Sequence, residues 1–343
     1  MTERPLLLRG FGLMTPVGLG TAASCAAIRA AIDNFQETRF IARGGDWIIG
    51  AEVPLVEPWR GIAKLAHLLA GALLETLEAV PDVPAETLPL ILCVAERDRP
   101  GRLDGLEQDL YDRVCALLGV KFHEATRVLP DGRVGPAVAL HHARRLLAQD
   151  GHRHVVVAGV DSLLVGETLT TYDEAGRLLT PNAVDGFIPG EAAGAFLVST
   201  DDGSPGLVCH GLGFAQEPSA VDPDLPLRGD GLAAAFRAAF ADAALDWNAV
   251  DYRITDISGE QQRFKEAALA LTRVMRVRKE EFDLWHPADC IGEAGAGALP
   301  VMLAVAYHGT AKGYAPGQGV LVHAGNDDGR RIAAVVRARA GSG

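Results

Sequence analysis

The chain has 343 residues, 48% of them hydrophobic and 22% charged, which is enough to bury the core of one large α/β unit or of two fused halves. Its 44 acidic and 32 basic residues leave a formal net charge of −12, which disfavours nucleic acid and anionic membranes as partners. Cysteines at positions 25, 93, 115, 209 and 290 include no CxxC pair, so we expect neither a disulfide framework nor a thiolate metal site.

The N-terminal segment contains only three consecutive leucines, which is too short for the apolar region of a signal peptide. Residues 62–80 come nearest to a membrane span, but Lys64, His67, Glu75 and Glu78 interrupt them. This pattern favours an amphipathic helix over a transmembrane one. Together with the cysteine usage, it predicts a cytoplasmic protein without a membrane anchor.

Short apolar runs alternate along the chain with longer segments of helical spacing. This alternation predicts an α/β fold in which helices cover a mainly parallel sheet. Strands are predicted at 5–12, 88–94, 154–160, 193–199, 206–212, 251–257, 318–324 and 331–337. Helices are predicted at 20–33, 60–80, 104–118, 136–149, 229–244, 262–276 and 293–308.

A polar segment at residues 201–205 (DDGSP) divides this series of elements into two parts. Each part closes with strands that follow a helix-rich stretch, as expected for an internal duplication that has diverged too far to show sequence repeats. The predicted halves are residues 1–202 and 203–343.

Common cofactor and metal motifs are incomplete in this chain. The glycines at 18–20 lack the third glycine of a dinucleotide fingerprint, and no glycine-rich loop is followed by a Lys-Ser or Lys-Thr pair. The histidines at 141–142 and 152–154 have no ligand partner at metal-binding spacing, and the acidic residues at 222–224 lack the rest of a calcium loop. We therefore expect no cofactor and no metal.

One segment carries a specific signature. Residues 185–198 read DGFIPGEAAGAFLV and resemble the DGFxxGEGAG segment, with its following strand, of the β-ketoacyl synthases, the decarboxylating condensing enzymes of fatty acid and polyketide synthesis. Residues 10–18, 154–162, 227–257 and 292–297 are similar to further family segments. The resemblance implies a thiolase-like αβαβα fold of five layers, built from two duplicated halves.

In that family a cysteine at the N-terminus of a buried helix attacks the thioester, because the helix dipole and free N–H groups lower the thiol pKa. Two histidines then polarise the malonyl thioester for decarboxylation. The resemblance places the cysteine position at Arg133. It places the first histidine of the HGTGT motif at Ser258, and the threonines that help hold phosphopantetheine at Glu260 and Gln262.

The second histidine position falls at Asp289, and the lysine five residues earlier in the family becomes Leu284. All three catalytic groups are thus replaced at the aligned positions. Because a nucleophile and a proton partner are both required, we expect no condensation or decarboxylation by the family mechanism.

An arginine at a helix N-terminus is electrostatically unfavourable and costly to bury unless a carboxylate pairs with it. We expect Arg133 to be neutralised by Asp289, Glu260 or Glu293, so that an ion pair fills the old reaction centre. The alternative is an exposed turn around Arg133, with Pro136 starting the following helix at its first position.

Cys290, with His286 nearby, is the candidate for residual chemistry, because a thiol near a helix N-terminus can be activated. Its alternative role is a small buried apolar residue. Phe187 either gates a remnant acyl pocket or packs in the core. Architectural or pocket roles are predicted for Asp161, Asp185, Gly186, Phe187, Gly190, Glu191, Glu260, Gly325 and Asn326.

Three functions are compatible with this pattern. The first is a catalytically inactive subunit or adaptor that forms a homodimer, or a heterodimer with a ketosynthase paralogue, through the strand at 154–160. An acyl carrier protein or a cargo protein is a further expected partner. The second is a condensing or acyl-transfer enzyme acting on acyl carrier protein or acyl-CoA thioesters through an altered site based on Cys290 or Ser258. The third is a binding module for an acyl chain or a cargo protein, which requires an open pocket.

Overall fold

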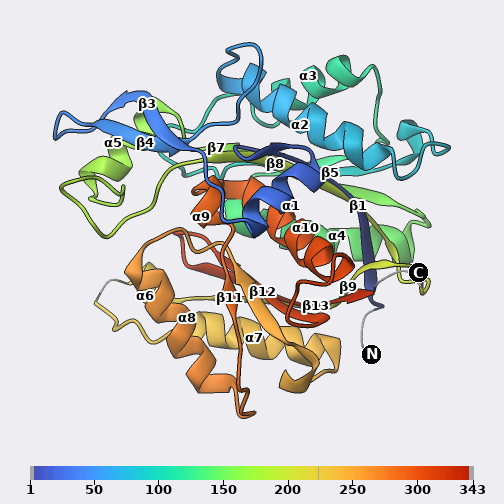
Figure 1. Ribbon diagram of the computed structural model, residues 1–343. Helices are drawn as coiled ribbons and strands as arrows, with labels where there is room; N and C mark the ends of the chain where they lie inside the picture. The colour runs from blue at the N-terminus through green and yellow to red at the C-terminus, as the bar shows by residue number, and fades with distance from the viewer. Residues whose placement is uncertain (1–3, 223, 340–343) are drawn as a thin grey trace.

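The computed structural model describes residues 4–222 and 224–339. In these ranges the strands join into one eleven-stranded sheet, which is folded into two facing parts, with a separate two-stranded hairpin (Figure 1). The first part is formed by β1 (Leu6–Thr15), β5 (Leu90–Cys93), β6 (Arg127–Leu129), β7 (Val155–Ser162) and β8 (Glu191–Thr200). The second is formed by β9 (Gly206–Gln216), β10 (Tyr252–Thr255), β11 (Leu284–Trp285), β12 (Gly319–Gly325) and β13 (Arg330–Arg339). The short strand β2 (Gly18–Leu19) pairs with β1.

The two parts have the same strand order and orientation. The first runs β6-β5-β7-β8-β1 and the second β11-β10-β12-β13-β9, and Leu6–Leu8 of β1 pair with Leu207–Cys209 of β9 to join them. In each part the first two pairings are parallel and the last two antiparallel. We infer from this repeat an internal duplication whose halves meet between β8 and β9.

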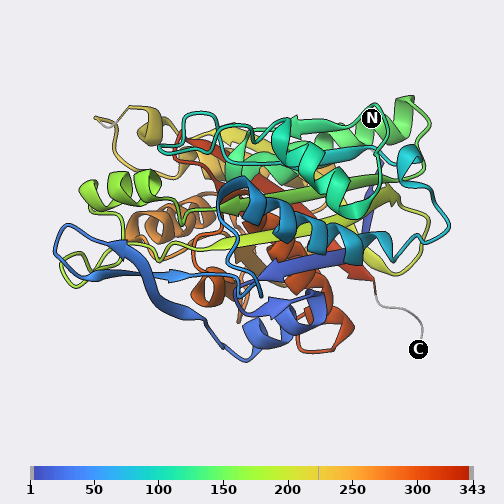
Figure 2. The ribbon, with the colours of Figure 1, turned by 90° about the horizontal axis from the view of Figure 1, so that it is seen from above.

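Helices complete five layers, which follow one another from top to bottom in Figure 1, and Figure 2 shows the outer helices of the first sheet from above. The layer above the first sheet holds α2 (Gly61–Leu77) and α3 (Asp109–Leu118), and the layer below the second holds α7 (Asp230–Ala243) and α8 (Gln261–Val274). Between the sheets lie α4 (Gly135–Gln149) and α10 (Ala298–Ala311), with α1 (Thr21–Arg29) packed against α10. The predicted five-layer thiolase-like fold is confirmed.

Apolar side chains explain this layering. The central helix α10 is apolar on nearly all sides, as expected for a helix buried between two sheets. Its side chains share one core with inward-facing residues of both sheets, whereas α2 and α7 each cover a separate core on the outer face of one sheet. The fold therefore directs the N-termini of α4 and α10 to one region between the two sheets.

The strand predicted to pair with a second chain lies inside the sheet. Val155–Ser162 (β7) is hydrogen-bonded along one edge to β5 and along the other to β8. Its side chains are buried on both faces, which is typical of a central strand. The predicted dimer contact through 154–160 is therefore wrong, because this strand has no free edge.

Three further differences concern secondary structure. The hairpin of β3 (Phe35–Ile41) and β4 (Trp47–Ala51) and the helix α5 (Gly166–Glu174) were not predicted. The short helices α6 (Pro218–Val221) and α9 (Ala288–Ile291) were also missed. Helix α10 starts at Ala298 rather than at 293, because Gly292 and Gly295 have positive φ angles of 68° and 52° and interrupt the helix.

In the described ranges no helix has both the length and the apolarity needed to cross a membrane.

Candidate functional site

Arg133 lies where the chain enters α4, in a short turn over Gly132–Val134. Gly132 has a φ of 58°, and a Cβ on it would meet the Glu96 carboxylate at 2.3 Å, so a glycine is required before Arg133. Arg133 is only 7% exposed, so the alternative of an exposed turn is wrong. Pro136 is the second residue of α4 instead of its first.

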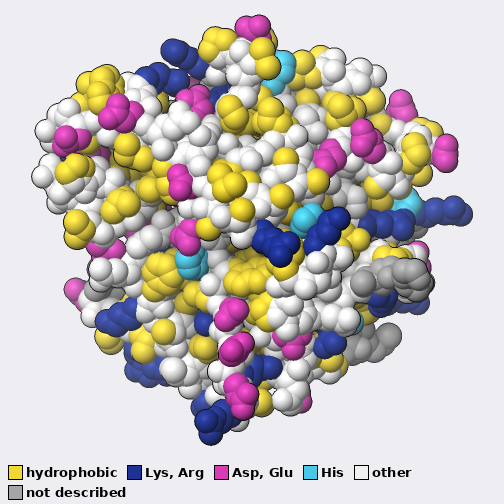
Figure 3. Space-filling view, viewed as in Figure 1, with side chains coloured by type: hydrophobic (Ala, Val, Ile, Leu, Met, Phe, Trp, Pro, Cys, Tyr) yellow, Lys and Arg dark blue, Asp and Glu magenta, His cyan; other side chains and the backbone are white. Residues whose placement is uncertain are grey.

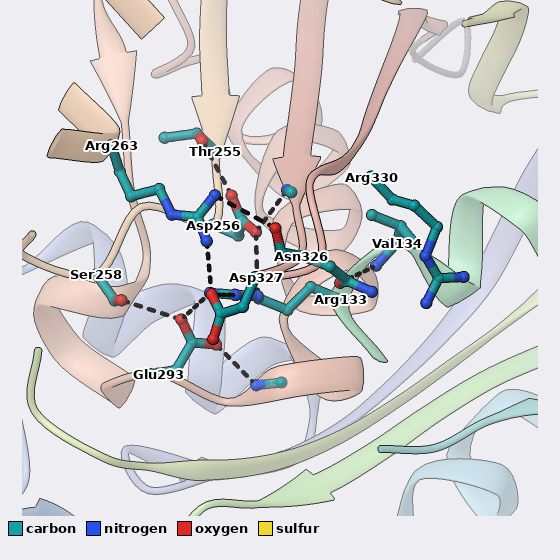
Figure 4. A network of polar contacts seen from close by, with 12 residues as sticks. Arg133, Val134, Thr255, Asp256, Ser258, Arg263, Glu293, Asn326, Asp327 and Arg330 are labelled. Atoms are coloured by element: carbon teal, nitrogen blue, oxygen red, sulfur yellow. Dashed lines mark hydrogen bonds and ion pairs between the residues drawn. The ribbon is translucent and has the colours of Figure 1, made fainter. Parts of the chain in front are cut away.

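Carboxylates surround the Arg133 guanidinium from three other segments (Figure 4). Its Nη1 donates to Glu293 Oε2 at 3.0 Å, and its Nη2 donates to Asp327 Oδ1 at 2.6 Å. Asp256 Oδ2 lies 3.9 Å from Nε. Burial alone would lower the pKa of Arg133, but the charges of these three carboxylates outweigh it and raise the pKa. Arg133 is therefore a permanent cation inside the fold.

Ser258, which the sequence resemblance places at the first histidine position, follows β10 and joins the same group. Its Oγ donates to Glu293 Oε2 at 3.0 Å, the oxygen that Arg133 also contacts. Glu293 Oε1 accepts from the Gly295 N–H at 3.0 Å. Glu293 is thus shared between the Arg133 guanidinium, the Ser258 hydroxyl and a backbone donor.

Asp327 is the centre of a wider network. Besides Arg133 it binds Arg177 at 2.7 Å and Arg263 at 2.6 Å, and Tyr172 donates its hydroxyl to it at 3.3 Å. Although burial acts to raise the pKa of Asp327, the three arginines hold it well below its ordinary value. Arg177 also pairs with Glu260 at 2.7 Å. Glu260, at a pantetheine threonine position, is thus tied to the network.

The surroundings shift the pKa values of Asp327 and Asp256 in opposite directions. Burial, together with the nearby charge of Glu293, raises the pKa of Asp256. Three arginines (Arg133, Arg177, Arg263) face four carboxylates (Glu293, Asp327, Asp256, Glu260).

Of the three carboxylates expected to neutralise Arg133, only Glu293 contacts it. Glu260 has Arg177 as its partner. Asp289 lies on α9 with its side chain 68% exposed and pairs with His286 at 2.8 Å. The structure therefore brings Arg133 and Ser258 together and leaves Asp289 outside this network.

Cys290 and His286 lie in a surface cleft that lacks Arg133 and Ser258. Cys290 is 4% exposed, and burial and the charges of Asp289 and Asp33 raise its pKa to about 11. Its thiol is therefore protonated at neutral pH and is a weak nucleophile.

Two buried acidic residues at the ends of neighbouring strands connect different layers. Asp161, at the end of β7, accepts from Arg99 at 2.9 Å and from the Ala296 N–H at 3.1 Å. Glu191, at the start of β8, pairs with Lys64 at 2.6 Å and accepts from the Val53 N–H at 2.8 Å.

Phe187 packs edge-on against Tyr172 in a small core beneath α5 and the hairpin. Asp185 accepts from the Gln261 N–H at 2.8 Å, at the start of α8. Asn326 is buried, and its amide donates to the Asp131 carbonyl at 2.8 Å next to the Arg133 turn. Backbone and side-chain atoms pack closely over Gly186, Gly190 and Gly325.

The sequence did not identify Arg177, Arg263, Asp256 or Asp327 as site residues. Asp327 had a local signal, since it is inserted directly after the Gly325-Asn326 pair. No motif marks Arg177. Its position in the site depends on how the loop after α5 folds.

Comparison with known proteins agrees with this fold. A family model for the N-terminal domain of β-ketoacyl synthases matches residues 135–203, and no curated protein matches the sequence. The family match confirms the resemblance predicted from the sequence over the segment that contains α4, β7 and β8.

Three solved structures illustrate the likeness. One is the ishigamide ketosynthase/chain length factor, with a TM-score of 0.72, 18% identity and coverage of 98% of this chain and 99% of that one. Another is a type II polyketide acyl carrier protein in complex with its ketosynthase, with a TM-score of 0.80, 15% identity and coverage of 98% and 100%. A ketosynthase in complex with its chain length factor from Xenorhabdus doucetiae has a TM-score of 0.75, 12% identity and coverage of 98% and 98%. At these identities the shared property is the ketosynthase fold over nearly the whole chain.

Proposed function

We propose that this chain is a non-catalytic, β-ketoacyl synthase-like subunit that pairs with an active ketosynthase. The observation that carries the proposal is Arg133. At the helix N-terminus where the family places its nucleophile, the chain has a buried guanidinium bonded to Glu293 and Asp327. A permanent cation with two carboxylate partners has no lone pair to attack a thioester.

The surroundings of Arg133 support the same proposal. Glu260 and Asp327 bind Arg177, so ion-paired side chains line a cleft of about 410 Å³ on the side on which the family holds phosphopantetheine. This charged lining favours the subunit over a module that binds an apolar acyl chain, because such a module needs an apolar pocket. These contacts also disfavour an acyl-transfer enzyme based on Ser258, whose hydroxyl is bonded to Glu293.

The solved neighbours include two that name both a ketosynthase and a chain length factor. By analogy we propose a heterodimer with a ketosynthase paralogue in the cytoplasm. An acyl carrier protein would then deliver its acyl group to the ketosynthase partner, because this chain has no group to accept it.

The partner contact is best placed at a free sheet edge. In the part of the chain that the structure describes, the eleven-stranded sheet ends at β6 and at β11. Strand β6 leads directly into the Arg133 turn, whereas β11 has only two residues. We propose that a partner strand adds to β6, since an unpaired edge is a template for another strand.

The test is purification of the tagged, full-length chain from its native cells, followed by native mass spectrometry of the complex and identification of the second chain. We expect a one-to-one complex with a ketosynthase that keeps the cysteine and both histidines. Recovery of only homodimers, or of complexes without any ketosynthase, would contradict the proposal.

A further inference from the structure

A cleft of about 460 Å³ opens where α1, β11, α9 and the end of α10 meet, and it shares no lining residue with the Arg133 network. Its volume lies within the range of ~300–1,000 Å³ that is common for small-molecule sites. Figure 3 shows hydrophobic side chains gathered near the centre of this face, where Figure 1 places α9, β11 and α10, with Lys or Arg and His side chains beside them.

Aromatic rings form one wall of the cleft. Trp285 and Tyr314 lie nearly parallel, with 6.2 Å between ring centroids and 24° between ring planes. Trp285 also contacts the buried Tyr252 at 4.5 Å, which fixes it from behind. Ile28 and Val305 supply aliphatic surface. A flat apolar group would find a rigid stacking surface here.

The cleft also contains a cation that is not neutralised within the described chain. The Arg29 guanidinium lies 4.3 Å from the centre of the Tyr314 ring, and no described carboxylate lies within 4.0 Å of it. Asp289, the acid that lines the cleft, is paired with His286 at 2.8 Å. In a chain of net charge −12, an arginine stacked on an aromatic ring and left without an acid partner favours an anionic ligand.

We propose that this cleft binds a small aromatic carboxylic acid, with its ring on Trp285 and its carboxylate paired with Arg29. The aromatic wall recognises the apolar body, and the planar guanidinium fits a carboxylate through two parallel hydrogen bonds. The inference does not depend on the proposed subunit function, because neither Arg133 nor β6 contributes to the cleft.

The probes are 1-naphthaleneacetate and the uncharged 1-naphthaleneacetamide, which have nearly the same shape. Calorimetric titration of the purified chain should show the acid binding about tenfold more tightly than the amide, as expected for one charge-assisted contact. Arg29→Gln should reduce acid affinity to the level of the amide and leave amide binding unchanged. Trp285→Ala should weaken both probes.

Arg43→Gln is the matched control, because Arg43 is an exposed arginine on the hairpin loop and lines no part of the cleft. Its affinity for both probes should equal that of the unchanged chain. Circular dichroism of each variant checks that it is folded. The proposal is overturned if neither probe binds at about 5 mM, which is a very weak affinity. It is also overturned if folded Arg29→Gln binds the acid as tightly as the unchanged chain does.

Discussion

Arg133 illustrates how a replaced residue reshapes its surroundings. A lone guanidinium at a helix N-terminus would be repelled by the dipole and would pay a large desolvation cost. The chain offsets both effects with Glu293 next to α10 and Asp327 after β12, so the cation is tied to two segments more than 150 residues away. The ion pairs therefore connect the two halves of the fold at the N-terminus of α4.

We expect Arg133→Met to destabilise the protein by about 3–5 kcal/mol, because it leaves buried carboxylates without their cation. Arg133→Met combined with Glu293→Gln should recover a substantial part of this loss, since the amide removes one uncompensated charge and still accepts from the Gly295 N–H. Urea unfolding of the unchanged chain, the two single variants and the double variant measures the coupling energy between Arg133 and Glu293.

The matched control Arg43→Met, at a 66% exposed side chain, should change the unfolding free energy by less than about 0.5 kcal/mol. Losses that simply add in the double variant would contradict a direct Arg133–Glu293 interaction.

Asp327 and Asp256 should respond to pH in opposite ways. The arginines depress the pKa of Asp327, so its stabilisation is present above the ordinary aspartate pKa and is lost as pH falls through the folded value. Asp327→Asn should therefore cost roughly 2–3 kcal/mol at pH 7, and this cost should shrink below about pH 4. Burial raises the pKa of Asp256, so its charged form costs stability as pH rises.

Asp256→Asn should consequently leave stability unchanged or raise it at pH 7 to 8, with any gain disappearing toward pH 4. The asparagine oxygen can still accept from the Gly325 N–H, which Asp256 binds at 3.0 Å. Unfolding free energies measured between about pH 2 and 8 provide the comparison. Parallel pH profiles for the two variants would contradict the opposite pKa shifts of Asp327 and Asp256.

Among the elements, the sequence predicts most of the sheet because its strands are apolar runs with clear ends. The hairpin β3–β4 was missed because β3 (FQETRFI) is polar at most positions and has no buried face along its length. Strand β7 was found, but it was assigned to a dimer contact although its unbroken apolar run VVVAGV is typical of a central strand. Pairing edges depend on strand order, which one sequence does not reveal.

The same limit applies to the site. The Arg133 position could be located because it precedes a recognisable helix segment, and the Ser258 position because it follows a recognisable strand. Glu293 could be proposed as a partner from charge alone. Arg177 could not be found, since its distance to Asp327 is set by the path of the chain between α5 and β8. The alignment with the family predicted Asp289 at the second histidine position, but its side chain points to solvent from α9.

At the level of the element, β6 provides the test of the partner contact. The Val94 N–H donates to the Leu129 carbonyl, so Leu129 faces β5 and, by strand alternation, Val128 directs its N–H to the free edge. Val128→Pro removes this outward donor and keeps the ladder to β5. We expect the variant to stay folded and to lose the ketosynthase partner.

Size-exclusion chromatography with light scattering reports this loss as a change from heterodimer to monomer mass. The control is Val56→Pro, because Val56 lies in a loop and its side chain is 97% exposed. Ser219→Pro is not suitable as a control, because Ser219 lies in a helix. Retention of the partner by a folded Val128→Pro variant would exclude β6 as the contact.

For the whole molecule, two repeated sheets and a shared layer of central helices preserve the ketosynthase architecture around a changed centre. The buried core does not depend on the identity of the catalytic residues, because α4 and α10 are held by apolar contacts along their length. The same fold can therefore form with different residues at the N-terminus of α4.

The most direct test of this account is the reactivity of the purified chain toward thioesters. The chain is incubated with malonyl and acyl thioesters of coenzyme A and of an acyl carrier protein, and intact mass and thiol release are followed over time. We predict an unchanged protein mass and thiol release no faster than in buffer. A stoichiometric acyl adduct, or malonyl decarboxylation that Ser258→Ala or Cys290→Ala abolishes, would contradict the claim that this chain has no group able to attack a thioester.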